Sequence, residues 1–269
     1  MNQEYLLKTL TPIFSYGANQ KQPEIRAPSI RGQLRWWMDK IGHADQVDRI
    51  FGSTAGGDAR ASKVIVRVGN VSGNDEAKGK PLPHKNWKPN QCYKRGTSFS
   101  VMIIERLISA KSDFSREREI LHKTLQAWIH LGTLGGRGTR GAGSIWPQDQ
   151  YPTEAEWAQL VSDCSQGSSL KIRLSKEAYK YEEDARKDIC NTLGETCFPN
   201  KQLGGIEPRK TSPLRLRVVR FADCDRDRPF RICAVWTERN EHDLDKAAGI
   251  LASRGKQLGK ILQNAIRIN

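Results

Sequence analysis

The chain has 269 residues, 37% of them hydrophobic, which is enough for one large or two small globular domains with a packed core. Its 44 lysines and arginines against 30 aspartates and glutamates leave a formal net charge of +14, which favours a polyanionic partner such as RNA, DNA or an anionic membrane surface. No stretch reaches the roughly 18 apolar residues of a membrane span, and the first residues lack the apolar run of a secretory signal, so we expect a cytoplasmic protein.

The first half of the chain predicts the order strand, helix, strand, strand, helix, strand. Ser29 is the expected N-cap of the first helix and Gly42 its stop. Apolar residues recur at helical or alternating spacing through these elements. The periodicity places strands at 5–14, 63–68, 98–105 and 144–146, and helices at 29–41 and 117–131.

The second half predicts a similar order, although the two halves share no residue-level repeat. We expect strands at 170–174, 214–221 and 231–236, and helices at 178–193 and 243–266. A β-α-β-β-α-β order is typical of a ferredoxin-like or RRM-like sandwich. The predicted fold class is therefore α+β, with tandem ferredoxin-like domains at 1–150 and 151–269.

Two long polar segments, 72–96 and 195–213, interrupt these elements and are loops by composition. At about 20 residues each, they exceed the usual connection length, and such loops are generally functional or disordered. The charge is also uneven, because 1–150 holds 23 basic against 13 acidic residues and 151–269 holds 21 against 17. The first half is thus the more basic one.

The strongest local signal is the glycine-rich segment LGGRGTRGAGSIWP at 134–147, directly after the second helix. Glycine lets the backbone approach a phosphate closely and adopt positive φ, and arginine supplies a planar fork of donors. The segment therefore suits a phosphodiester chain, with a flexible helix-to-strand connection as the alternative. A G-x-G-x-x-G match here follows a helix, so dinucleotide binding is not supported. The residues concerned are Gly135, Gly136, Arg137, Gly138, Arg140, Gly141 and Gly143.

The start of the first helix is the second signal. Arg31 and Arg35 lie four residues apart beside Ser29, and Arg26 precedes them. Free N–H groups and a partial positive charge make a helix N-terminus an anion site, although a solvated basic edge would have the same sequence. Trp36 points away from the core face and either stacks on a ligand or packs against a partner.

The insertion at 72–96 is a candidate nucleic-acid finger. Basic side chains follow phosphates and aromatic rings stack on bases, at roughly 1 to 3 kcal/mol per base, but a solvated loop has the same composition. Lys63 with Arg67, and Arg215 with Arg217, extend a possible basic surface on strands. The residues of the finger are Lys78, Lys80, His84, Lys85, Trp87, Lys88, Tyr93, Lys94 and Arg95.

Signals for catalysis are weak. The five histidines show no H-x-x-x-H or H-E-x-x-H spacing, so we expect no metal and no cofactor. The six cysteines form no C-x-x-C pair and are expected to be reduced and mostly packed. Asp45, Asp48 and Asp58 could host a metal or a base, but acidic residues after a helix usually cap or solvate it. We expect no catalytic residues.

Four segments, in this order, resemble the RAMP superfamily of CRISPR-associated proteins. They are TPIFSYGANQ (11–20), EIRAPSIRGQLRWW (24–37), FGST (51–54) and LGGRGTRGAGSI (134–145). Within that superfamily the pattern is similar to the Cmr-type head subunit of type III-B effector complexes. The motifs cover about the first 150 residues, and nothing in 151–269 matches a motif of this kind.

The resemblance implies tandem ferredoxin-like domains at the end of a multi-subunit filament, near the 3′ end of a guide RNA. It implies an RNA-capturing cap without catalytic residues, because target cleavage belongs to another subunit. The implied partners are guide CRISPR RNA, complementary target RNA and neighbouring effector subunits, and no membrane. Ser29, Arg31 and Arg35 fall on the helix-start motif of the family, and Arg137 and Arg140 on its glycine-rich loop.

The predicted function is a non-catalytic RNA-binding subunit in which the glycine-rich loop and the helix start form one cationic cradle. One alternative is a metal-independent endoribonuclease that processes precursor guide RNA, since relatives in the superfamily use His or Tyr acid-base pairs. Another is a protein-only scaffold whose arginines meet acidic neighbours. The predicted RNA-binding residues are Arg26, Ser29, Arg31, Arg35, Lys63, Lys85, Lys88, Gly135, Gly136, Arg137, Gly138, Arg140, Gly141 and Gly143.

Overall fold

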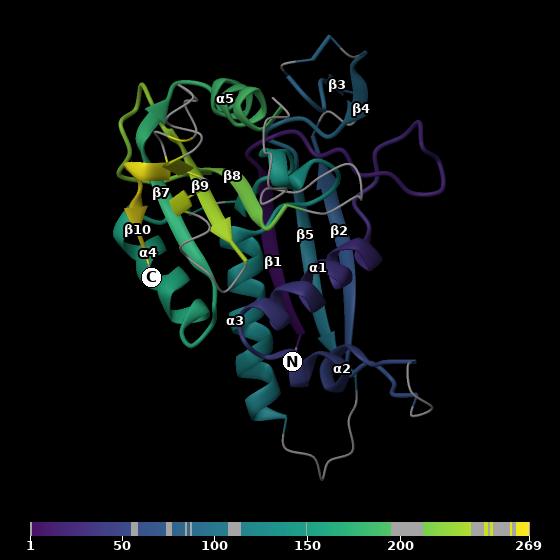
Figure 1. Cartoon of the computed structure of the whole chain (residues 1–269). Coiled ribbons are helices and arrows are strands. Elements are labelled where there is room, and N and C mark those ends of the chain that lie inside the picture. The colour runs from purple at the N-terminus through teal and green to yellow at the C-terminus, as the bar shows by residue number, and fades with distance from the viewer. Residues whose placement is uncertain are drawn as a thin grey trace.

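The chain folds around two four-stranded antiparallel sheets, which Figure 1 shows side by side. The computed structural model describes residues 2–54, 59–73, 77–83, 85–86, 88–106, 114–148, 150–194, 212–237, 245–246, 248–249, 259 and 262–268.

The first half forms a ferredoxin-like unit. Its strands lie in the sheet order β2-β5-β1-β6, so in chain order within this half the arrangement is 4-1-3-2. The predicted order of elements is confirmed. The elements are β1 (Asn2–Thr9), α1 (Ala27–Lys40), α2 (Ala44–Phe51), β2 (Val64–Ser72), β5 (Ser98–Glu105), α3 (Ser115–Leu131), the 3-10 turn η1 (Gly138–Arg140) and β6 (Ile145–Pro147).

The second half repeats this arrangement. Its sheet order β10-β7-β9-β8 is again 4-1-3-2, which confirms the predicted tandem fold class. The expected helix at 243–266 lies mostly outside the described residues; its described pieces at 245–246, 248–249 and 262–263 are helical. Its expected end was wrong, because 266–267 is a strand. The elements are α4 (Glu154–Ser165), β7 (Lys171–Tyr179), α5 (Glu182–Gly194), β8 (Leu214–Arg220), β9 (Phe230–Trp236) and β10 (Ile266–Arg267).

Several boundaries differ from the prediction. The first strand ends at Thr9 because the chain then leaves the sheet, and Ile13 and Phe14 form isolated bridges instead. The helix expected from 178 begins at Glu182, since β7 continues through Tyr179.

Four elements escaped the sequence analysis altogether. The segment 72–96 is not simply a loop, because β3 (Ala77–Gly79) and β4 (Asn90–Cys92) pair within it. Helix α2 and helix α4 were both missed, although Thr153 and Glu156 form a capping box at the start of α4. The segment 195–211 lies outside the described residues.

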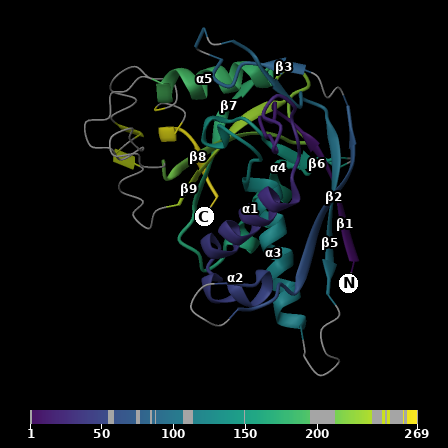
Figure 2. The same ribbon diagram turned by 90° about the vertical axis from the view of Figure 1, so that its right-hand side faces the viewer.

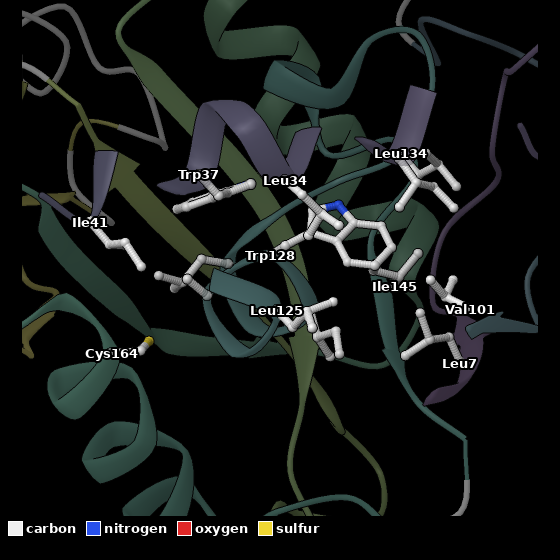
Figure 3. Packing of buried hydrophobic residues seen from close by; sticks show 14 of the residues in the cluster. Leu7, Leu34, Trp37, Ile41, Val101, Leu125, Trp128, Leu134, Ile145 and Cys164 are labelled. Carbon is white, nitrogen blue, oxygen red and sulfur yellow. The ribbon is translucent and has the colours of Figure 1, made fainter. Parts of the chain in front are cut away.

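Helices α1 and α3 cover one face of the first sheet, and Figure 2 shows no described element on the opposite face. Helix α1 buries Ile30, Leu34, Trp37 and Met38, which recur at helical spacing and form one stripe. The residues of this core gather around the indole of Trp128 in Figure 3. Burial of α1 against α3 thereby fixes where the first turn of α1 lies.

The second sheet is buried on both faces, because β8 and β9 are buried at nearly every position although β8 carries three arginines. Leu216 and Val218 of β8 pack with Ile189 of α5, whereas Val219 belongs to the core that extends from the first half. The two halves are therefore joined through β8.

Candidate nucleic-acid interface

A hollow of about 780 Å³ opens between the first turn of α1, the turn after α2 and the start of β2. Four arginines line it, and its described lining contains no acidic side chain. It is therefore a cationic surface of the size of a ligand site. Its lining residues are Ala27, Pro28, Arg31, Gly32, Arg35, Gly52, Ser53, Thr54, Arg60, Ser62, Val64, Ile65, Val66 and Arg106.

The N-terminus of α1 faces this hollow without a cap. The N-cap residue is Arg26, which makes no side-chain capping hydrogen bond, and the first turn holds no acidic residue. The prediction that Ser29 is the N-cap was wrong, because the helix begins at Ala27 and places Ser29 inside its first turn. Arg26 itself lies 3.9 Å from a carboxylate oxygen of Glu24. The partial positive charge of the helix end is thus offset by neither a capping side chain nor an acidic residue of the first turn.

Arg31 and Arg35 reach across the hollow to the C-terminal end of α2. Arg31 donates through Nη2 to the carbonyl of Phe51, and Arg35 donates through Nη1 to the carbonyl of Gly52 at 2.7 Å. The other Nη of Arg35 lies 2.7 Å from a carboxylate oxygen of Asp48. These bonds satisfy carbonyls that a helix end leaves open. The helix-start and F-G-S segments are therefore parts of one structure.

Gly52 allows the turn that brings these parts together. Its φ is +74°, and a Cβ there would lie 2.5 Å from the carbonyl oxygen of Arg60. The hydrogen bonds between Ser53 and Arg60 close the same turn at 2.8 and 3.1 Å. Glycine is needed here for both its positive φ and its missing side chain.

Arg60 and Arg106 complete the hollow, and sequence analysis missed both. Each is exposed, and within the described part of the chain neither side chain has a hydrogen-bond or ion-pair partner. Arg106 follows β5, and its amide donates to the carbonyl of Lys63 at 2.9 Å, which aligns it with the start of β2. Neither arginine belongs to a motif, so only the strand pairing could have revealed them.

Lys63 lies close to this region, but an acidic residue partly neutralises it. Its ammonium lies 3.3 Å from a carboxylate oxygen of Glu117 and 5.1 Å from the ring centroid of Phe114. Glu117 is buried, so this contact joins α3 to β2. The ion pair lowers the charge that Lys63 can offer to a phosphate.

The glycine-rich segment does not line the hollow, so the expected single cradle is divided in two. Gly135, Gly136 and Arg137 are exposed, whereas residues 141–146 are buried. The amide of Gly136 donates to the carbonyl of Phe14 at 2.7 Å. The exposed tip therefore adjoins the strip of chain that leads towards α1.

The buried glycines of this segment serve packing, Gly141 against the second half and Gly143 within the first half. The amides of Gly141 and Gly143 donate to the carbonyls of Leu216 at 3.1 Å and of Pro12 at 2.8 Å, so they are not available to a phosphate. Gly143 has a φ of +68°, and a Cβ there would lie 1.8 Å from the carbonyl oxygen of Leu134. Gly138 and Arg140 lie in the half-buried η1, and burial lowers the pKa of Arg140.

The insertion is anchored to the second half. Arg186 of α5 donates to the carbonyls of Lys80 and Pro81 at 3.3 and 3.4 Å, while Lys85 and Lys88 are exposed. Tyr93 was wrongly expected to stack on a base: it is buried, and its hydroxyl donates to the carbonyl of Pro23 at 3.0 Å. His84 and Trp87 lie outside the described residues.

The expected basic surface on β8 was also wrong. Arg217 is buried and donates to the carbonyls of Ile129, at 3.0 Å, and Ile145. The guanidinium of Arg215 lies 3.7 Å from the ring centroid of Trp36, so Trp36 packs within the chain. Burial lowers the pKa of Arg215 to about 10 and that of Arg217 to about 9. We call Arg186, Arg215 and Arg217 the junction arginines.

The structure also describes the cysteines, the metal-ligating side chains and the character of the helices. The described cysteines form no disulfide, and burial raises the pKa of the Cys164 and Cys233 thiols to about 12. No cluster of metal-ligating side chains exists among the residues that the structure describes. None of the helices described has the length and apolar character needed to cross a bilayer.

Comparison with known proteins adds to this geometry. A family model described as the RAMP superfamily matches residues 6–146. The CRISPR system Cmr subunit Cmr1-1 of Pyrococcus furiosus is 28% identical over an alignment of 154 residues that covers 52% of this chain and 43% of that protein. The Cmr subunit Cmr1-2 of the same organism is 25% identical over an alignment of 177 residues that covers 52% of this chain and 91% of that protein. The match thus spans less than half the length of Cmr1-1.

Two solved structures are similar in fold. The crystal structure of Cmr1 from Pyrococcus furiosus in its apo form has a TM-score of 0.59 at 18% identity and covers 88% of each chain. A chain in the cryo-EM structure of the Type III-B Cmr-beta bound to cognate target RNA and AMPPnP has a TM-score of 0.55 at 11% identity, covering 89% of this chain and 96% of that one.

Proposed function

The chain belongs to the RAMP superfamily, and from this premise we propose that it is a non-catalytic, RNA-binding subunit of a type III CRISPR ribonucleoprotein. It holds guide RNA and its target by the sugar-phosphate backbone, near the 3′ end of the guide, while other effector subunits adjoin it. Residues 1–150 and 151–269 are its two domains. The similarity to Cmr subunits and to a chain of a complex bound to cognate target RNA supports this assignment.

The single observation that carries the proposal is the cationic hollow beside the uncapped start of α1. Arg60 and Arg106 offer exposed guanidinium groups, and the described lining adds no carboxylate to oppose a phosphate. Guanidinium groups and a helix N-terminus both bind phosphate oxygens. Such contacts hold the backbone and leave sequence to base pairing between guide and target.

The exposed tip at Gly135, Gly136 and Arg137 and the insertion residues Lys85 and Lys88 are proposed as flanking contacts. Sequence-independent binding of this kind depends on many phosphates. The hollow supplies the central contacts to the RNA backbone, and these segments add contacts to the phosphates on either side.

The chemistry of the hollow favours binding over RNA cleavage. Metal-independent cleavage needs a general acid and a general base close to the attacked phosphate. The described lining of the hollow contains no histidine, tyrosine, lysine or carboxylate. His130 is buried, and burial together with Arg217 lowers its pKa to about 3, which removes it from acid-base work at the surface.

The test uses the full chain and a labelled 20-nucleotide single-stranded RNA. We expect the Arg60→Ala/Arg106→Ala double variant to bind RNA about tenfold more weakly, because two phosphate contacts are lost. The matched control is Arg226→Ala/Arg228→Ala, which removes the same charge from an exposed loop of the second half and should cost much less. Equal losses of RNA affinity in the two variants would show that net charge alone attracts the RNA, and would refute the hollow as the RNA-binding site.

The two alternatives have their own readouts. Site-specific cuts in precursor guide RNA, made in EDTA and lost on His→Ala changes, would favour the endoribonuclease. RNA crosslinking that survives both Arg60→Ala/Arg106→Ala and Arg226→Ala/Arg228→Ala would favour the protein scaffold.

A further inference from the structure

Gly32 is a glycine inside a helix. It is the sixth residue of α1 (Ala27–Lys40), and neither a cap nor a kink explains it there. Glycine in a helix interior is disfavoured relative to alanine because it loses more backbone freedom on folding. A glycine at this position therefore needs a reason.

The packing of the protein gives no such reason. A Cβ built on Gly32 meets no atom within 4 Å, and its φ is not positive. Gly52, Gly135 and Gly143 differ, because a Cβ on each would meet backbone atoms at 2.5, 2.7 and 1.8 Å. The fold requires glycine at those three positions and would accept a side chain at Gly32.

The position of Gly32 points to a ligand. Gly32 is exposed and lines the hollow. In the chain it lies four residues after Pro28, next to Arg31 and three residues before Arg35. Residues three and four apart share one face of a helix, so a bare patch of backbone lies between the proline and the second arginine. Glycine is the residue found where a ligand approaches the backbone closely.

We propose that Gly32 is a close-approach position, at which the sugar-phosphate chain of the bound RNA lies directly against the backbone of α1. This inference rests on the proposed function of the hollow. A side chain at position 32 would hold the strand away from the helix N-terminus and from Arg60 and Arg106. The missing side chain sets the depth at which the strand is bound.

The proposal predicts opposite effects on stability and on binding. Gly32→Ala should raise the Tm of the full chain by about 2–4 °C, because alanine favours the helix and meets no neighbour. The same change should weaken binding of a 20-nucleotide single-stranded RNA about fivefold, and Gly32→Gln should weaken it further. The control Gln159→Ala, on an exposed face of α4, should leave RNA binding unchanged.

Each other outcome overturns the inference. A Tm that rises while RNA affinity stays unchanged means that no strand lies against Gly32. A Tm that falls means that a side chain at 32 does meet the protein. Loss of binding to a neighbouring subunit with RNA affinity intact means that protein, not RNA, covers Gly32. If Arg60→Ala/Arg106→Ala weakens RNA binding and Gly32→Ala does not, only this inference fails; if neither does, the proposed function fails too.

Discussion

Arginines of this chain lie in two regions with opposite surroundings. In the hollow, Arg60 and Arg106 are exposed and have no side-chain partner within the described residues. At the junction of the two halves, Arg186 is 3% exposed and Arg217 is 1% exposed, and both donate to main-chain carbonyls. The first pair is open to a ligand, and the second pair is committed to the fold.

The difference shows that a basic sequence does not by itself define a nucleic-acid surface. A buried guanidinium is costly unless its donors are bonded, and Arg186 and Arg217 accordingly lie where carbonyls of the other half accept from them. Removal of Arg186 or Arg217 should therefore cost stability, and removal of Arg60 or Arg106 should cost binding alone.

The largest effect is expected at Arg217. Arg217→Ala removes two hydrogen bonds and leaves the carbonyls of Ile129 and Ile145 buried without a donor. We expect the free energy of unfolding to fall by about 3 kcal/mol or more, as measured by urea denaturation. Arg60→Ala is the control and should stay within about 0.5 kcal/mol of the parent chain. Similar losses in the free energy of unfolding of the two variants would contradict the contrast between buried and exposed arginines.

The next effect concerns a buried glycine of the glycine-rich segment. Gly143→Ala places a Cβ against the carbonyl of Leu134 at a φ of +68°. We expect a loss of about 2–3 kcal/mol in the free energy of unfolding, because both the contact and the backbone conformation are unfavourable. Gly32→Ala, with the opposite expected sign, is the matched control in the same thermal and urea experiments.

His130 tests the electrostatics of the junction. Burial and the nearby Arg217 lower its pKa from 6.5 to about 3, so only the unfolded chain takes up this proton between those two pH values. Stability should therefore fall as the pH drops below 6.5, with a contribution of up to about 1.4 kcal/mol per pH unit. His130→Gln should lose this contribution, and urea titrations at pH 7 and pH 5 measure it. An unchanged pH dependence in the variant would contradict the assignment.

The smallest expected effect is in the salt dependence of RNA binding. Each phosphate contact contributes about 0.7 to the slope of log affinity against log salt on a single strand. Arg60→Ala/Arg106→Ala should therefore reduce the slope by about 1.4. Arg226→Ala/Arg228→Ala, measured across the same salt series, should reduce it less. If Arg226→Ala/Arg228→Ala reduced the slope and Arg60→Ala/Arg106→Ala did not, the RNA would bind outside the hollow.

Much of the fold follows from local patterns. The alternation at 63–68 and the apolar run at 98–105 correctly predicted β2 and β5, and helical spacing predicted α1 and α3. Helix α2 escaped because its eight residues are too few to show a clear helical periodicity. Such patterns depend on residues a few positions apart, which is why they can be recognised from the sequence alone.

Local patterns in the sequence were sufficient to predict the order of elements, the tandem ferredoxin-like class and the two basic segments of the RAMP resemblance. Which arginines remain open depends on the packing of the whole chain. That packing buried Arg217, tied Arg31 and Arg35 to the end of α2, and brought Arg60 and Arg106 together. The physical reason is that secondary structure depends on local periodicity, whereas the partner of a charged side chain depends on atoms that strand pairing and helix packing bring from distant parts of the chain.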